Sequence, residues 1–69
     1  MGVSAITDAG VAALLAEAAM RGAALNVKTT LAAMSDHAWR DQTEAELALL
    51  VQRGAQLAHA VEDLVESRL

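Results

Sequence analysis

The acidic and imidazole side chains near the C-terminus are the first that could do chemistry. His59 is followed by Glu62 and Asp63 at three and four residues, and by Glu66 one turn further on. On a helix such spacings share one face, so two of these side chains could bind one metal ion. A carboxylate site in a helical bundle also needs Glu-x-x-His pairs on facing helices. The N-terminal half has no acidic residue followed three positions later by histidine. A small ligand- or metal-binding bundle built on His59 and its neighbouring carboxylates is therefore the alternative function, and we expect no cofactor and no metal.

A second group, Ser35, Asp36 and His37, contains the residue types of a nucleophilic triad. Consecutive residues cannot adopt the nucleophile–base–orienter geometry, because each member must approach the next from a different part of the fold. The chain also lacks a phosphate-binding glycine loop and the Cys/His spacing of a zinc site. The sequence therefore predicts that the protein is not an enzyme and has no catalytic residues.

Trp39 and Arg40 indicate a surface for protein contact. Trp39 is the only aromatic residue of the chain, and tryptophan and arginine are enriched among the residues that dominate binding energy at interfaces. Two compatible interpretations are open, since Trp39 could cover the open end of a helical core or contact a partner. Leu49 is a third candidate, because it lies opposite the apolar side of its predicted helix. We expect Trp39, Arg40 and Leu49 to bind a partner.

The composition predicts an all-α protein. Hydrophobic residues make up 55% of the 69 residues, much of that is alanine, and proline and cysteine are absent. No segment combines β-branched residues with the two-residue alternation of a strand. The net charge is −4 and the five basic residues are dispersed, which argues against nucleic acid or a membrane as partner. The apolar run 11–16 is too short for a secretion signal, and charged residues interrupt the longer apolar stretch. We expect a cytoplasmic location.

The last third of the chain predicts a long amphipathic helix over residues 44–68. Thr43 is a suitable N-cap, and Glu46 three residues later completes a capping box. Apolar residues then recur at alternating steps of three and four, and Val51, Ala58 and Val65 widen this stripe. The members of the stripe are Leu47, Leu50, Gly54, Leu57, Val61 and Leu64. Of these we expect Leu50, Leu57, Val61 and Leu64 to form the core.

The first half of the chain predicts another helix, over about residues 5–35. Its apolar residues also follow helical spacing, and Glu17 and Arg21 are placed to form an ion pair one turn apart. Gly22 and Asn26 lower helix propensity, so a break near either residue is the alternative. We favour a continuous helix, because the apolar stripe crosses both residues without losing phase.

The polar segment between the two helices is too short for a domain linker, so residues 1–69 should form one domain, an antiparallel two-helix hairpin. Such a hairpin covers one side of each helix only. The first helix is apolar over more than half of its circumference, so we expect a homodimer that forms a four-helix bundle, although a different protein could fill the same place. From this architecture the sequence predicts a small non-enzymatic protein–protein interaction module, similar in role to an adaptor, chaperone or inhibitor.

Overall fold

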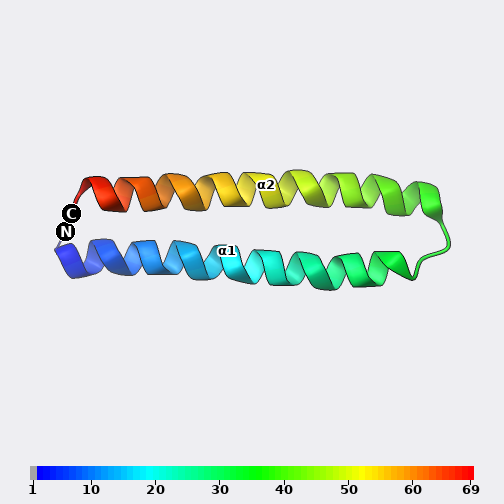
Figure 1. The fold of residues 1–69 in the computed structure, drawn as a ribbon, viewed down its shortest axis with the longest axis horizontal. Coiled ribbons are helices and arrows are strands. Elements are labelled where there is room, and N and C mark those ends of the chain that lie inside the picture. Colours follow the sequence, from blue (N-terminus) through cyan, green and yellow to red (C-terminus); the bar gives the residue numbers. More distant parts are fainter. Residues whose placement is uncertain (1) are drawn as a thin grey trace.

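A computed structural model describes residues 2–69 and shows two long helices that run antiparallel (Figure 1). Helix α1 spans Val3–Ala32 and helix α2 spans His37–Ser67. The hairpin is thin and elongated, with Cα extents of 52 × 16 × 12 Å. Both ends of the chain lie at one end of the hairpin, and the short connection lies at the other (Figure 1). The predicted all-α helical hairpin is confirmed.

Helix α1 is continuous through Gly22 and Asn26, as the phase of the apolar stripe predicts. The β-branched residues near its end fit the helix because their hydroxyls bond within it. Thr29 Oγ1 donates to the Leu25 carbonyl at 3.0 Å, and Thr30 Oγ1 donates to the Asn26 carbonyl at 3.2 Å. The helix therefore accommodates both threonine hydroxyls without interruption.

Helix α2 begins at His37 rather than at residue 44, so the predicted start of this helix is wrong. Asp36 is the N-cap, and its Oδ1 accepts a hydrogen bond of 3.1 Å from the backbone N–H of Trp39. Thr43 lies inside the helix, where its hydroxyl donates to the Trp39 carbonyl at 2.8 Å. Because the helix already starts after Asp36, Thr43 is an interior residue and no capping box forms there. Trp39 and Arg40 consequently lie on the first turn of α2 and not in the connection.

Small residues line the contact between the two helices. Gly10 is buried against Val65, and a Cβ atom added at Gly10 would lie 3.3 Å from Val65 Cγ1. Gly54 faces Met20, whose sulfur occupies the space that a Cβ atom at Gly54 would need. Glycine at these two positions lets the helix axes approach closely, since a larger residue would hold them apart.

The predicted core is wrong for three leucines of α2. Leu50, Leu57 and Leu64 are 62%, 63% and 58% exposed, whereas Val61 is half-buried as expected. Two overlapping apolar stripes of α2 have the spacing of a helix–helix contact. One includes Leu50, Leu57 and Leu64, and the other includes Val51, Ala58 and Val65. The second stripe, which has the smaller side chains, faces α1. The residues of α2 that face α1 are Leu47, Val51, Gly54, Ala58, Val61 and Val65.

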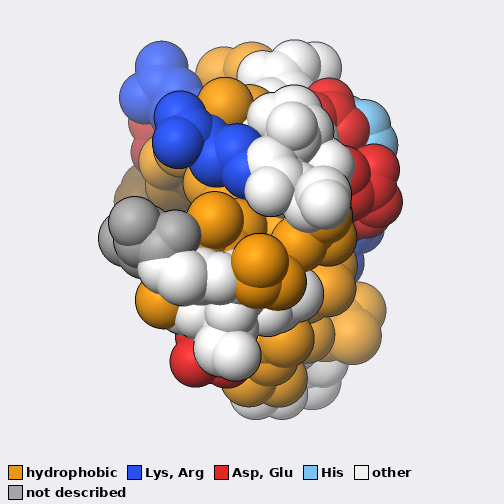
Figure 2. Space-filling model, turned by 90° about the vertical axis from the view of Figure 1, so that its left-hand side faces the viewer, with side chains coloured by type: hydrophobic (Ala, Val, Ile, Leu, Met, Phe, Trp, Pro, Cys, Tyr) orange, Lys and Arg blue, Asp and Glu red, His pale blue; other side chains and the backbone are white. Residues whose placement is uncertain are grey.

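The hairpin buries little apolar surface. Within residues 2–69, the buried hydrophobic side chains are Ala24, Leu31 and Ala58. Figure 2 looks onto the end of the hairpin that carries both chain ends and shows hydrophobic side chains spread over the surface, above all on its lower, α1 side.

By length and composition α1 could cross a membrane, with a window of mean hydropathy 1.5. Core helices of water-soluble proteins pass the same test, but they are mostly buried, whereas 6% of this window is buried in the hairpin. The expectation that no membrane is a partner stays a prediction.

Candidate functional site

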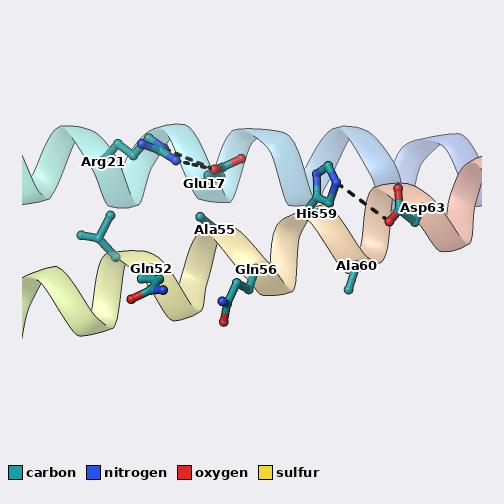
Figure 3. Close-up of a pocket in the computed structure, with 9 residues that line it drawn as sticks. Glu17, Arg21, Gln52, Ala55, Gln56, His59, Ala60 and Asp63 are labelled. Carbon is teal, nitrogen blue, oxygen red and sulfur yellow. Dashed lines mark hydrogen bonds and ion pairs between the residues drawn. The ribbon is translucent and has the colours of Figure 1, made fainter.

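Polar side chains from both helices line one side of the hairpin (Figure 3). They border a shallow, open groove of about 640 Å³, which Val51, Ala55 and Ala60 of α2 also line. We call this surface the polar groove. Its polar members are Glu17 and Arg21 of α1, and Gln52, Gln56, His59 and Asp63 of α2.

The charged groups of the polar groove pair within their own helices (Figure 3). Arg21 Nε and Nη2 both donate to Glu17 Oε2, at 3.2 and 3.0 Å, which confirms the predicted ion pair. His59 Nε2 lies 4.0 Å from Asp63 Oδ2. The Glu17 side chain is 23% exposed, and the other three are more than half exposed. Water therefore reaches these charges, and such exposed pairs contribute little to stability.

The alternative function, a ligand or metal site at His59, lacks a complete ligand set. Helix α2 does place His59 beside Asp63, one turn away. Across the part of the chain that the structure describes, however, no three His, Cys, Asp or Glu side chains come close enough to hold a metal ion. Glu62 is half-buried and Glu66 is exposed, and α1 brings no additional acidic residue to them. The arrangement offers solvated charges rather than a coordination site.

The three predicted partner-binding residues all lie on α2, where they form two separate surfaces. Trp39 is 48% exposed, and Arg40 beside it is half-buried with its Nε 3.5 Å from Asp41 Oδ1. Leu49 is 67% exposed, which confirms its expected exposure. It lies about 15 Å further along the helix than Trp39, at 1.5 Å per residue, in a groove that it lines together with Leu50 and with polar neighbours such as Glu46. That these residues bind a partner stays a prediction.

An apolar face on the side opposite the polar groove was missed by the sequence interpretation. It combines leucines of α2 with alanines of α1, each set recurring every seven residues. Two shallow grooves of about 270 Å³ each follow it, one beside Leu57 and one beside Leu64. The seven-residue spacing was visible in the sequence, but it was assigned to the core. We call this surface the leucine–alanine face, and it consists of Leu50, Leu57 and Leu64 with Ala9, Ala16 and Ala23.

Comparison with known proteins identifies a family. The sequence model described as Formiminotransferase-cyclodeaminase matches residues 2–49, more than two thirds of the chain. The match includes all of α1 and the first part of α2 as far as Leu49, and it leaves out His59 and Asp63. No curated protein matches the chain, and no solved structure matches it.

The match overturns the prediction that the protein is not an enzyme, because this family consists of enzymes. That prediction depended on the absence of a local catalytic motif, and a helical fragment of an active site need not contain one. When an active site takes one residue from each of several helices, these residues have no fixed spacing in the sequence. A single sequence therefore does not reveal them. The chain belongs to the formiminotransferase-cyclodeaminase family.

Proposed function

We propose that this chain is a helical part of an enzyme of the formiminotransferase-cyclodeaminase type, and that further helices complete its active site. The observation that carries this proposal is the family match over α1 and the start of α2. The shape of the hairpin supports it as well. Catalytic groups act best where water is excluded, whereas the polar side chains of the polar groove are largely solvated.

The family name describes two reactions, the transfer of a formimino group and a ring closure with loss of ammonia. In the second, a neighbouring amine forms a bond to the formimino carbon. The formimino group reacts as its formamidinium cation, so the former imine nitrogen already carries two hydrogens. It takes up the proton that the attacking amine gives up, its bond to the carbon breaks, and it leaves as ammonia, while the positive charge stays on the new N–CH–N unit of the ring. A general acid–base group can carry that proton. Glu17 is our candidate, because it lies in the matched segment and is the least exposed charged side chain of the polar groove.

The same proposal gives the chain a binding role within the enzyme. Trp39, Arg40 and Leu49 lie inside the matched segment, and two of them expose large apolar surfaces. We propose that they contact other helices of the assembly.

A membrane is a poor alternative partner, because α1 would bring the Glu17–Arg21 ion pair into the bilayer. Each of these charges costs about 2.5–3.5 kcal/mol at the centre of a spanning helix. The proposed location is the cytoplasm.

Native capture tests the proposal. The tagged chain is purified from its host, and ammonia release is measured with an N-formimino compound that carries a neighbouring amine. We expect the captured assembly to release ammonia, and the same assembly with Glu17→Gln to release it at least about 100-fold more slowly, the range for loss of a general acid–base group. Arg21→Gln is the matched control for loss of the ion pair alone. A captured assembly that releases no ammonia contradicts the proposed function.

A further inference from the structure

We propose that a groove next to the polar groove binds an acidic amphipathic helix from outside residues 1–69. It lies between α1 and α2 on the connection side of the polar groove and has a volume of about 480 Å³. We call it the lysine groove. The inference deepens the proposed function, because it rests on that function for the further helices and states the chemistry of one of them. The side chains that carry the argument are Arg21, Leu25 and Lys28 of α1, with Leu47 and Val51 of α2.

The lysine groove exposes apolar surface that the hairpin leaves uncovered. Leu25 is 64% exposed, and Leu47 and Val51 opposite it are half-buried. Two helices alone form the walls, so one side of the groove is open to water. A small-molecule site usually encloses about 70–90% of its ligand, which this open groove cannot do. A third helix laid along the groove can cover these side chains, as in helix-in-groove recognition.

The charge of the lysine groove indicates an acidic partner. Arg21 and Lys28 are its charged lining residues and no carboxylate lines it, although the chain has a net charge of −4. Arg21 is already paired, since its Nε and Nη2 donate to Glu17 (Figure 3). Lys28 is exposed and forms no ion pair within residues 2–69. A partner carboxylate beside Lys28 would therefore give the complementary charge that fixes the register of a docked helix.

The spacing along α1 predicts the pattern of the partner helix. Arg21, Leu25 and Lys28 follow one another at steps of four and three, so they form one stripe of the helix. An apolar side chain thus lies between two cations that are about 10.5 Å apart along the axis. Helices that pack side by side match such stripes position by position. We expect the partner helix to carry an apolar residue between two acidic residues seven positions apart.

Lys28 is the only lysine of the chain, so a single type of cross-link tests this docking site. A carbodiimide activates a carboxylate, and the lysine amine then displaces the activating group, which leaves as a urea, and forms an amide bond. The two side chains must be in direct contact for this reaction. In the natively captured assembly we expect mass spectrometry to find Lys28 joined to an Asp or Glu of a segment outside residues 1–69 that has the predicted pattern.

The control for the cross-link is Lys28→Arg, which keeps the charge but removes the amine. It should abolish the cross-link and leave the amount of captured partner unchanged. A Lys28 cross-link to a carboxylate of residues 1–69, in the same or a second copy, overturns the inference. So does a cross-link to a segment without the predicted pattern, or the absence of any protein cross-link at Lys28.

Two further substitutions measure the charged and the apolar contact separately, with helical circular dichroism as the check on folding. Lys28→Glu brings like charges together, so we expect at least about tenfold less of the cross-linked partner to be captured. Arg68→Glu, the same charge change outside the lysine groove, should lower capture less than about threefold. Leu25→Ala should lower it about tenfold, whereas Leu15→Ala, at a similar exposure of 66%, should not. Equal effects within each pair overturn the inference.

The outcomes separate this inference from the proposed function. If the captured assembly releases ammonia but Lys28 gives no cross-link to another protein segment, the inference fails and the proposed function stands. If the expected cross-link forms but the captured assembly releases no ammonia, the docking site stands and the proposed function fails.

Discussion

Replacing Gly54 by alanine tests how α1 packs against α2. A Cβ atom at Gly54 would overlap the sulfur of Met20 and lie 2.9 Å from its methyl carbon. At Gly22 the same atom would meet nothing within 4 Å. Both changes gain about 1 kcal/mol of helix propensity, but at Gly54 the overlap costs about 1–3 kcal/mol. We therefore expect Gly22→Ala to stabilise the protein by about 1 kcal/mol, and Gly54→Ala to destabilise it by about 1 kcal/mol.

Thermal and denaturant unfolding at one fixed protein concentration measures this difference. About 2 kcal/mol between the two variants corresponds to a difference in melting temperature on the order of 10 °C for a chain of this length. Met20→Ala removes the overlapping side chain, so Gly54→Ala added to it should stabilise by about 1 kcal/mol, as at Gly22. Equal stabilisation by Gly54→Ala and Gly22→Ala in the wild-type background would refute the alignment of the two helices.

Three further changes test the cap, the core and the partner surface. Asp36→Ala should destabilise the protein by about 1 kcal/mol because it removes the N-cap, whereas Thr43→Ala should change stability by less than about 0.5 kcal/mol. A larger loss of stability for Thr43→Ala than for Asp36→Ala in urea unfolding would show that α2 starts at the later cap. Leu31→Ala should cost about 2–5 kcal/mol, since Leu31 is 2% exposed, and a loss under 1 kcal/mol by the same method would contradict its place in the core. Trp39→Ala and Leu49→Ala should keep the helical circular dichroism and weaken native capture; unfolding by Trp39→Ala with normal capture by Leu49→Ala would show that Trp39 only covers the hairpin end.

The fold could be predicted because helical period and chain length left few solutions. The apolar stripe of the first half crosses Gly22 and Asn26 in phase, and α1 is continuous there. The start of α2 was harder, since Asp36 and Thr43 are both good caps and only the earlier one is used. Two caps that compete within one polar segment cannot be ranked by local preference alone.

The choice of interface could not be predicted from the period of α2. Leu47, Gly54 and Val61 belong to two stripes at once, and the sequence interpretation chose the one that includes the larger Leu57. The structure places Ala58 in the contact instead, because Gly54 and Ala58 let the helices approach closely. Size complementarity with the opposite helix decides between such stripes, and it depends on an alignment that a single helix does not reveal.

The enzymatic family could not be predicted for a related reason. The candidate acid–base residue, Glu17, looks in the sequence like half of an ordinary helical ion pair with Arg21. A role in catalysis would depend on residues that other helices bring to it, and one hairpin carries no trace of them. The exposure of the leucines on α2, by contrast, is visible only once both helices are in place.

Sedimentation equilibrium of the wild-type chain at micromolar concentration is the most direct test of the central claim that the hairpin is incomplete alone. The account predicts a folded particle of twice the 7.2 kDa chain mass, with a melting temperature that falls on dilution. A compact particle of 7.2 kDa that melts cooperatively at the same temperature over a hundredfold dilution would contradict it.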